Sequence, residues 1–117
     1  MQIIQHLQPS TPGGSPGLQI LRMAGPTLGT AGFDCWLLSL APHASCDGRK
    51  EAGEHVLLVL QGLGKLLLAG APQRFSAPCT LVLPPWTDYR LVNQGTETLQ
   101  LLAVSSPATP SSTEGMP

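Results

Sequence analysis

The chain has 117 residues with a formal net charge of −1, and only 11% of them are charged, against about 25% in an average globular domain. This length fits one domain with a single core. The near-neutral balance and the scattered basic residues exclude an electrostatic footprint for nucleic acid.

The amino-terminal residues 1–10 lack the basic and apolar regions of a signal peptide. No apolar run approaches the roughly 20 residues that span a bilayer. The three cysteines, Cys35, Cys46 and Cys79, form an odd number without paired spacing, which disfavours a disulfide framework. We therefore expect a soluble cytoplasmic protein with free thiols and no membrane partner.

The first half of the chain predicts three short strands separated by turns. Gln2–Leu7 is a candidate edge strand and dimer contact, and Pro9–Gly17 is a loop because it holds three prolines and three glycines. Leu18–Met23 and Phe33–Ala41 predict strands on either side of a glycine-rich link at 25–32. The low overall charge also favours a homo-oligomer, which we expect to be a homodimer formed through the N-terminal strands.

The segment His43–Glu54 is the most polar part of the ordered chain, and His55–Gly70 directly after it is strongly apolar. A polar stretch between two apolar strands is where a functional site is expected. Gly62 and Gly64 interrupt the apolar run and would each cost a helix about 1 kcal/mol, so they favour a central hairpin. Because both of its arms are apolar throughout, we expect both of their faces to be covered.

The second half continues the pattern of short strands bounded by glycine and proline. Strands are expected at Gln73–Ser76, Cys79–Leu83, Asp88–Val92 and Thr98–Val104. The many leucines favour helix, but β propensity depends mostly on context, and no long amphipathic segment is present. The chain is therefore predicted to be all-β, a barrel or a sandwich.

Three segments are expected along the chain. Residues 1–17 form an N-terminal strand and a Pro/Gly-rich loop, and residues 18–104 form the barrel. Residues 105–117 are rich in Ser, Thr and Pro, a composition typical of a disordered tail.

Two spaced sets of residues resemble the two motifs of the cupin family, G-x5-H-x-H-x3-E-x6-G and G-x5-P-x-G-x2-H-x3-N. The first set is His43-x5-Arg49-x-Glu51-x3-His55-x6-Gly62, and the second is Pro78-x5-Pro84-x-Trp86-x2-Tyr89-x3-Asn93. Fifteen residues separate them, as in the short form of the family. The resemblance implies a small RmlC-like jelly-roll barrel, also called a double-stranded β-helix.

The structural positions of the motifs are kept, and the ligand positions are substituted. Where the family has His, His, Glu and His, this chain has Arg49, Glu51, His55 and Tyr89. The resemblance implies that these four side chains converge inside the barrel, where Trp86 is a further candidate for the pocket wall.

Three interpretations of the four positions remain open. Glu51 and His55 could hold a divalent metal, but two protein ligands are fewer than catalytic sites usually show, and the Arg49 cation opposes it. Alternatively, Arg49 replaces the charge of the metal and binds a carboxylate or phosphate, while His55 and Tyr89 are candidate proton-transfer residues that Glu51 orients. In the third interpretation, Arg49 pairs with Glu51 and the two rings are satisfied core residues.

We predict a protein that binds a small polar or anionic metabolite through Arg49, Glu51, His55, Tyr89 and Trp86, without the usual metal set. The alternative is a metal-dependent enzyme of isomerase or dioxygenase type that uses Glu51 and His55. A regulatory or structural module without a ligand is a third option.

Other polar and aromatic residues carry weaker hypotheses. His43 and Cys46 form an H-x-x-C pair that usually belongs to a loop. Trp36 is expected in the core or at a pocket wall, and Cys79 in the core. Lys65 is expected at the surface.

Overall fold

The structure is a computed structural model that describes residues 1–25, 32–49 and 55–105. Over these ranges the chain forms ten β-strands, so the predicted all-β class is confirmed. No helix within them is long and apolar enough to cross a membrane. The strands are β1 (Thr11–Pro12), β2 (Leu18–Ala24), β3 (Asp34–Leu40), β4 (Ser45–Arg49), β5 (His55–Gln61), β6 (Leu63–Leu68), β7 (Ala71–Ser76), β8 (Cys79–Leu83), β9 (Asp88–Asn93) and β10 (Leu99–Ser105).

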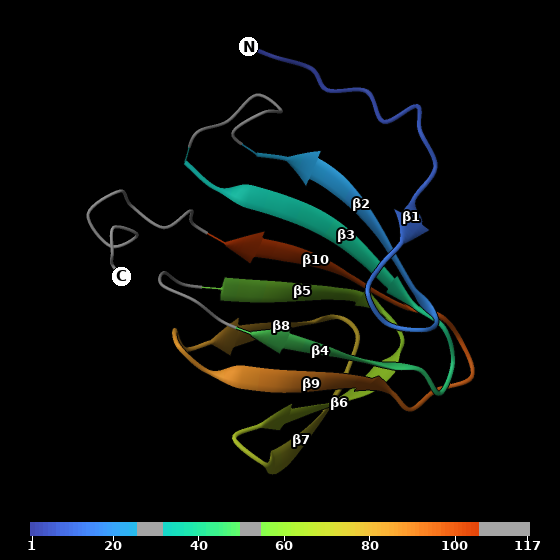
Figure 1. Ribbon diagram of the computed structural model, residues 1–117, viewed down its shortest axis with the longest axis vertical. Helices are drawn as coiled ribbons and strands as arrows, with labels where there is room; N and C mark the ends of the chain where they lie inside the picture. Colours follow the sequence, from blue (N-terminus) through green and yellow to red (C-terminus); the bar gives the residue numbers. More distant parts are fainter. Residues whose placement is uncertain (26–31, 50–54, 106–117) are drawn as a thin grey trace.

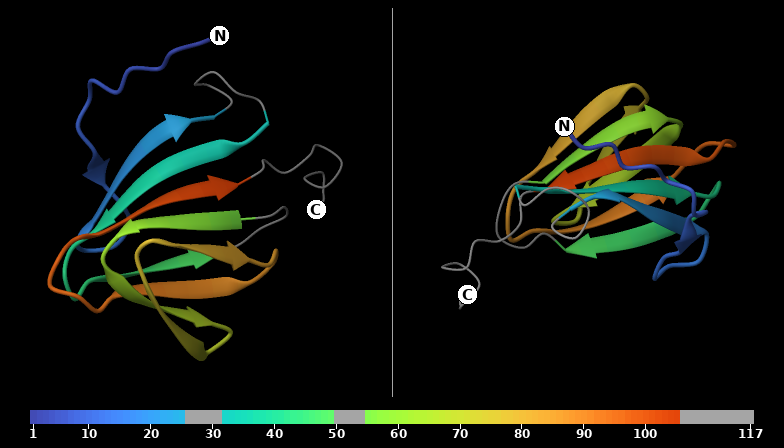
Figure 2. Two further views of the ribbon diagram at one scale, coloured as in Figure 1. Left: turned by 180° about the vertical axis from the view of Figure 1, so that it is seen from behind. Right: turned by 90° about the horizontal axis from the view of Figure 1, so that it is seen from above.

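The strands form two antiparallel sheets that pack as a jelly roll (Figure 1). A six-stranded sheet has the order β1-β2-β3-β10-β5-β8, and a four-stranded sheet has the order β4-β9-β6-β7. The two layers are seen from behind and from above in Figure 2. Strands distant in sequence are neighbours in both sheets, so most of the pairing is long-range.

The core lies between the sheets and consists mainly of leucine. Successive side chains of a strand point to opposite faces, so every second residue faces the interior. In β10, Leu99 and Leu101 are fully buried, and each lies beside an inward-facing residue of β3. The buried apolar residues are Leu40, Cys46, Leu57, Val59, Leu66, Leu83, Leu91, Leu99, Leu101 and Ala103.

The prediction of a central hairpin is wrong, because β5 and β6 do not pair with each other. β5 pairs with β10 and β8, whereas β6 pairs with β7 and β9 in the other sheet. Gly62 between them has a φ of 107°, a conformation that glycine adopts without strain, and it takes the chain from one sheet to the other. A glycine-rich turn between apolar runs is equally compatible with a hairpin and with such a corner.

The expectation that both faces of these strands are covered is also wrong. On β5, Leu57 and Val59 are buried in the core, but the alternate residues Val56 and Leu58 are partly exposed and Leu60 is 50% exposed. The outer face of this strand is therefore apolar without being covered by the described part of the chain.

The structure differs from the expected strands near the N-terminus and adds a strand in the polar segment. Residues 2–7 form no strand, and the first strand is the short β1 inside the predicted loop, paired with β2 at the sheet edge. Pro12 fits there because an edge strand does not need every N–H for pairing. The polar segment contains β4, because β9 supplies a pairing partner for it. The predicted tail lies largely outside the described residues.

Asn93 holds together the end of the barrel where β3 and β9 finish. The residue is 1% exposed. Its side-chain amide donates to the carbonyl oxygens of Leu40 at 2.9 Å and Glu97 at 2.8 Å, and its Oδ1 accepts from the Gly95 N–H at 2.8 Å. We call this the pinned end of the barrel, because a single side chain joins three segments there.

Candidate functional site

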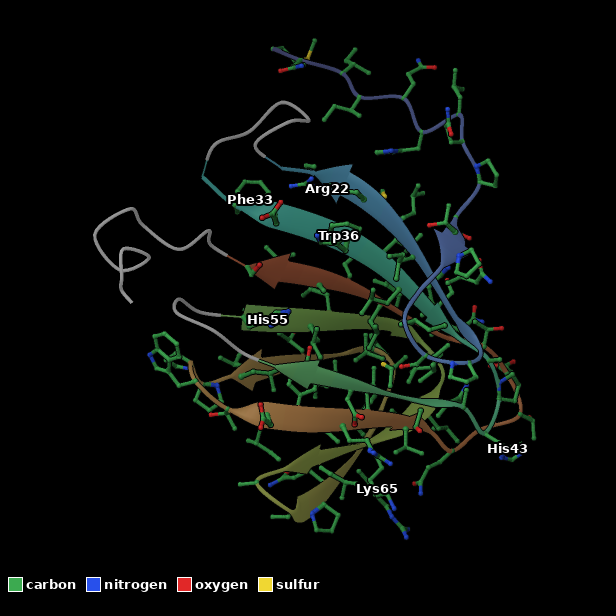
Figure 3. The ribbon with its side chains drawn as sticks, viewed as in Figure 1. Arg22, Phe33, Trp36, His43, His55 and Lys65 are labelled. Atoms are coloured by element: carbon green, nitrogen blue, oxygen red, sulfur yellow. The ribbon has the colours of Figure 1, made fainter. Side chains whose placement is uncertain are left out.

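The opposite end of the barrel carries several further polar side chains on the inner faces of the sheets, and we call it the mouth. Register places Asp34, Ser105 and His55 side by side in one row across β3, β10 and β5. This row is on the inner face, because it alternates with outward positions and shares its side with Leu57 and Ala103 of the core. Figure 3 shows His55 at the mouth and His43 at the other end of the strands.

His55 and Tyr89 meet across the interior from the two different sheets. Their ring centroids are 6.0 Å apart and their planes cross at 78°, an edge-to-face arrangement. Tyr89 lies opposite Gly48 on the neighbouring strand, and a Cβ at position 48 would overlap the phenol ring. The absence of a side chain at Gly48 therefore makes the room in which the Tyr89 ring lies.

The Tyr89 phenol stays protonated under physiological conditions. Burial raises the pKa of Tyr89 to about 12, and the nearby Cys46 adds to this effect. Burial, together with the charge of Asp47, also raises the pKa of the Cys46 thiol. The interior near β4 and β9 therefore offers a neutral hydroxyl that can donate or accept a hydrogen bond, and no phenolate.

The inner face of the six-stranded sheet carries an ion pair that was not predicted from the sequence. Arg22 lies opposite Trp36, whose side chain packs against the core, so the two share the inner face. The Arg22 guanidinium is 5.3 Å from the centroid of the Trp36 ring and 2.5 Å from the Asp34 carboxylate. The alternation Leu18, Ile20, Arg22 along β2 was the available signal, because it places a cation in line with two inward apolar residues.

The other predicted site residues are Arg49, Glu51 and Trp86, and the structure describes them to different extents. The backbone of Arg49 ends β4 opposite Asp88, but its side chain is outside the described part, and so is the whole of Glu51. Trp86 lies in the turn between β8 and β9 with 69% of its surface exposed and a φ of 60°. It is therefore at the rim of the mouth and not in the wall of a closed interior.

The weaker candidates are placed at separate sites. His43 is exposed in the β3–β4 turn, whereas Cys46 is buried in the core within a strand, so the two do not share a flexible loop as expected. Cys79 packs against the core, as predicted. Lys65 lies on the outer face of the four-stranded sheet beside Arg74, in agreement with a surface position.

The arrangement of the strands is shared with known proteins. A cupin 2 conserved barrel domain protein from Salinispora arenicola superposes with a TM-score of 0.75 at 26% identity, covering 92% of this chain and 91% of that one. The chain has the cupin fold. No family model matches the sequence.

Two curated relatives also match this cupin domain. Auxin-binding protein 1 from Arabidopsis thaliana is 33% identical over 103 residues, which cover 80% of this chain and 52% of that protein. A 1-hydroxy-2-naphthoate 1,2-dioxygenase from Nocardioides sp. (strain KP7) is 29% identical over 69 residues, covering 59% of this chain and 17% of that one. The chain thus spans about half the length of the first relative and a smaller part of the second.

The described residues of this cupin domain do not fit a metal ion. Within residues 1–25, 32–49 and 55–105, no three His, Cys, Asp or Glu side chains lie close enough to hold one. At the four positions that the resemblance identifies, the described side chains are the His55 imidazole and the protonated Tyr89 phenol, and a neutral phenol is a poor metal ligand. The described donor set suits hydrogen bonding to a ligand better than coordination.

Proposed function

We propose that this cupin domain binds a small polar or anionic metabolite at the mouth of its barrel, without a resident metal. The proposal is carried by the contact between His55 and Tyr89, two hydrogen-bonding rings that meet between facing sheets of a leucine-rich interior. Both rings can form hydrogen bonds with a polar ligand that enters between the sheets at this end.

The charge of the ligand follows from the cations available at this end. Arg22 brings a guanidinium to the inner face of β2. Arg49, which follows the inward-facing Gly48 at the end of β4, is proposed to reach the mouth over its rim with a second one. A guanidinium binds a carboxylate or a phosphate through two parallel hydrogen bonds. Asp34 neutralises part of the Arg22 charge, which favours a small ligand with one acidic group over a polyanion.

Roles for the remaining residues complete the proposal. The protonated Tyr89 hydroxyl donates a hydrogen bond to an oxygen of the ligand, and the His55 imidazole accepts or donates a second one. Glu51 orients one of these groups, and Trp86 covers the ligand from the rim. His55 and Tyr89 remain the candidates for any proton transfer.

A thermal-shift screen with carboxylates, phosphates and neutral sugars tests this function. We expect small monocarboxylates to raise the melting temperature, and we expect Tyr89→Phe and Arg49→Ala to abolish that rise. Arg74→Ala is the matched control, because it removes an exposed cation from the four-stranded sheet outside the mouth. If no compound stabilises the protein, or if Arg74→Ala loses the response equally, binding at the mouth is rejected.

A metal-dependent enzyme is the second candidate function, and the similarity to the naphthoate dioxygenase favours it. In that case Glu51 and His55 would hold the ion. Elemental analysis of protein purified without chelator distinguishes the two candidates. Stoichiometric Mn, Fe, Ni or Zn that disappears in Glu51→Ala and His55→Ala would overturn the metal-free proposal.

A cytoplasmic location and a homodimer belong to the same proposal. All three cysteines are free, which is consistent with a reducing compartment. The chain's low charge supports self-association, because two copies repel each other only weakly.

A further inference from the structure

The two sheets leave a cleft along one side of the barrel, and we call it the side cleft. β7 is the last strand of the four-stranded sheet and β8 is the last strand of the six-stranded sheet, and the two do not pair with each other. The space between these edges has a volume of about 340 Å³, which is within the range of small-molecule sites. Neither His55 nor Tyr89 lines it, so the side cleft is separate from the mouth.

The walls of the side cleft belong to the hydrophobic interior. β6 and β7 supply one wall, and β8 supplies the other. Leu66 and Leu83 are buried core residues, and alternate residues of their strands share the same inward direction. The side cleft therefore opens the edge of the core to solvent. Its apolar wall residues are Leu66, Leu68, Ala71, Phe75, Leu81 and Leu83.

Two polar side chains lie at the end of the side cleft that is far from the mouth. Gly64 pairs with Phe75 on β7 and with Asn93 on β9, so this part of β7 is near the pinned end. Arg74 is exposed and lines the cleft there, and Thr80, near the start of β8, lines it from the other sheet. A guanidinium and a hydroxyl on these two edges can bind one carboxylate together.

The other end of the side cleft is apolar. Leu68 pairs with Tyr89 on β9, and Leu83 pairs with His55 on β5, so this end adjoins the mouth. The side cleft thus has a cation at one end and leucine side chains at the other. An acid with an apolar chain has the same two parts.

Arg74 is available for an anion that enters the side cleft. Among the described residues, ion pairs join Arg22 to Asp34 and Arg90 to Asp47, and Arg74 belongs to neither pair. A guanidinium without a carboxylate of its own chain can form two parallel hydrogen bonds to the carboxylate of a ligand. The charge of the site therefore favours an acid over a neutral molecule of the same size.

The geometry points to an apolar acid as the ligand: we propose that the side cleft binds an unbranched carboxylic acid, with its carboxylate on Arg74 and its chain between the sheets. The wall residues span about four positions along each strand, which at about 3.3 Å per residue gives a length of about 13 Å. A volume of about 340 Å³ over this length is a narrow groove, which suits a single chain better than fused rings. An extended chain advances about 3.4 Å in three bonds, so about ten to twelve carbons fill the groove.

Calorimetric titration of the full chain with straight-chain acids tests the site. We expect one decanoate to bind per chain, and each methylene added between hexanoate and decanoate should strengthen binding about three- to fourfold, because it leaves water. Decanol lacks the charge and should bind about tenfold more weakly than decanoate. Several decanoates per chain, or an affinity that does not depend on chain length, would overturn the proposal.

Substitution of Arg74 tests where the carboxylate binds. Arg74→Ala should bind decanoate about tenfold more weakly and should no longer distinguish it from decanol. Lys65→Ala is the matched control, because Lys65 pairs with Arg74 in register but does not line the side cleft, and it should change the affinity by less than about twofold. Equal losses in the two variants would show a general effect of positive charge and would overturn the site.

A variant at the apolar end tests where the chain lies. Ala71 is exposed and lines this end, so Ala71→Phe should fold normally and fill part of the groove. Binding of decanoate should fall about tenfold, whereas the shorter hexanoate should keep its affinity. Circular dichroism and the melting temperature check the fold. A folded variant that binds decanoate as well as the native protein would overturn the proposed position of the chain.

Reciprocal variants separate the side cleft from the function proposed for the mouth. Tyr89→Phe should lose the response to small monocarboxylates and keep decanoate binding, and Arg74→Ala should do the reverse. Loss of decanoate binding in Tyr89→Phe would place the acid at the mouth and overturn the side cleft. If decanoate does not bind while small monocarboxylates still do, the side cleft is rejected and the proposed function of the mouth is retained.

Discussion

The two ends of the barrel use polar groups in opposite ways. At the pinned end, one buried amide side chain forms hydrogen bonds to three backbone groups of its own chain. At the mouth, side chains from the two sheets face one another, as the His55 and Tyr89 rings do. Polar side chains that hydrogen-bond to the backbone stabilise the fold, whereas polar side chains that face each other across an interior can also hydrogen-bond to a ligand. Substitutions at the pinned end should therefore affect folding, and those at the mouth should affect binding.

The largest effect is expected for Asn93→Ala. The change removes two buried hydrogen bonds, to the Leu40 carbonyl and from the Gly95 N–H, and a part-buried one to the Glu97 carbonyl, which should cost about 3–5 kcal/mol of unfolding free energy. Urea denaturation followed by tryptophan fluorescence measures it. Gln94→Ala, at the exposed neighbouring position, is the control and should stay within about 0.5 kcal/mol.

The next effect is expected at the corner between the sheets. Gly62→Ala puts a Cβ on a residue with a φ of 107° and 3.0 Å from the Leu99 Cα, which should cost about 1–3 kcal/mol. Gly14→Ala is the matched control, because a Cβ there meets nothing within 4 Å. Equal stability of the two variants would show that Gly62 is not needed to turn the chain.

A spectroscopic titration sharpens the comparison at the mouth. Tyr89 is the only tyrosine of the chain, so ultraviolet absorbance reports its ionisation directly. We expect a midpoint near the pKa of about 12 in the native protein and a return to the ordinary tyrosine pKa of 10.0 in urea. A native midpoint near 10 would place the phenol in water and remove the basis for a protonated donor.

The sign of the stability change with pH follows from the same pKa. The unfolded chain releases the phenol proton at lower pH than the folded chain, so this contribution is complete below pH 10.0 and is lost as the pH rises toward about 12. Native protein should therefore lose more stability over this range than Tyr89→Phe. Parallel pH profiles of the two proteins would contradict the assignment.

A smaller effect is expected for the contact between the two rings. An edge-to-face pair is worth about 0.5–1.5 kcal/mol beyond the area it buries, so a double-mutant cycle of His55→Ala and Tyr89→Leu should give a coupling in that range. The cycle is measured by urea denaturation without ligand. A coupling near zero would mean that the rings do not support each other in solution.

The smallest effect is expected on the outer face of the four-stranded sheet. Arg90 and Asp47 form an ion pair whose side chains are 53% and 71% exposed. Such pairs contribute little in water, so Asp47→Asn should change the unfolding free energy by less than about 1 kcal/mol. A larger loss, measured at low and at high salt, would show that exterior charge also contributes to holding the barrel together.

The sequence predicts much of this fold because glycine and proline mark the ends of its strands. Pro42 follows β3 and Pro84 follows β8, and the intervening apolar runs are too short for helices. Which strands pair with one another cannot be predicted from such local signals. Whether Gly62 closes a hairpin or joins two sheets depends on β9 and β10, which lie far along the chain.

The residues of the candidate site also differ in whether local sequence or long-range pairing reveals them. His55 and Tyr89 were found through their spacing in the cupin motifs, and the structure brings their rings into contact. Arg22 and Asp34 fall outside those motifs, so only the alternation along their strands and the long-range pairing of β2 with β3 place them inside. The exposure of Trp86 depends on its turn, which its position in the motif does not specify.

Gly48 has a consequence for engineering the mouth. Because the Tyr89 ring fills the space above a residue without a side chain, the depth of the interior is set at position 48 as much as at position 89. An added methyl group would displace the phenol and move its hydroxyl relative to His55. One atom on β4 would therefore change the ligand preference that we propose for the mouth, while His55 and Tyr89 keep their chemical identity.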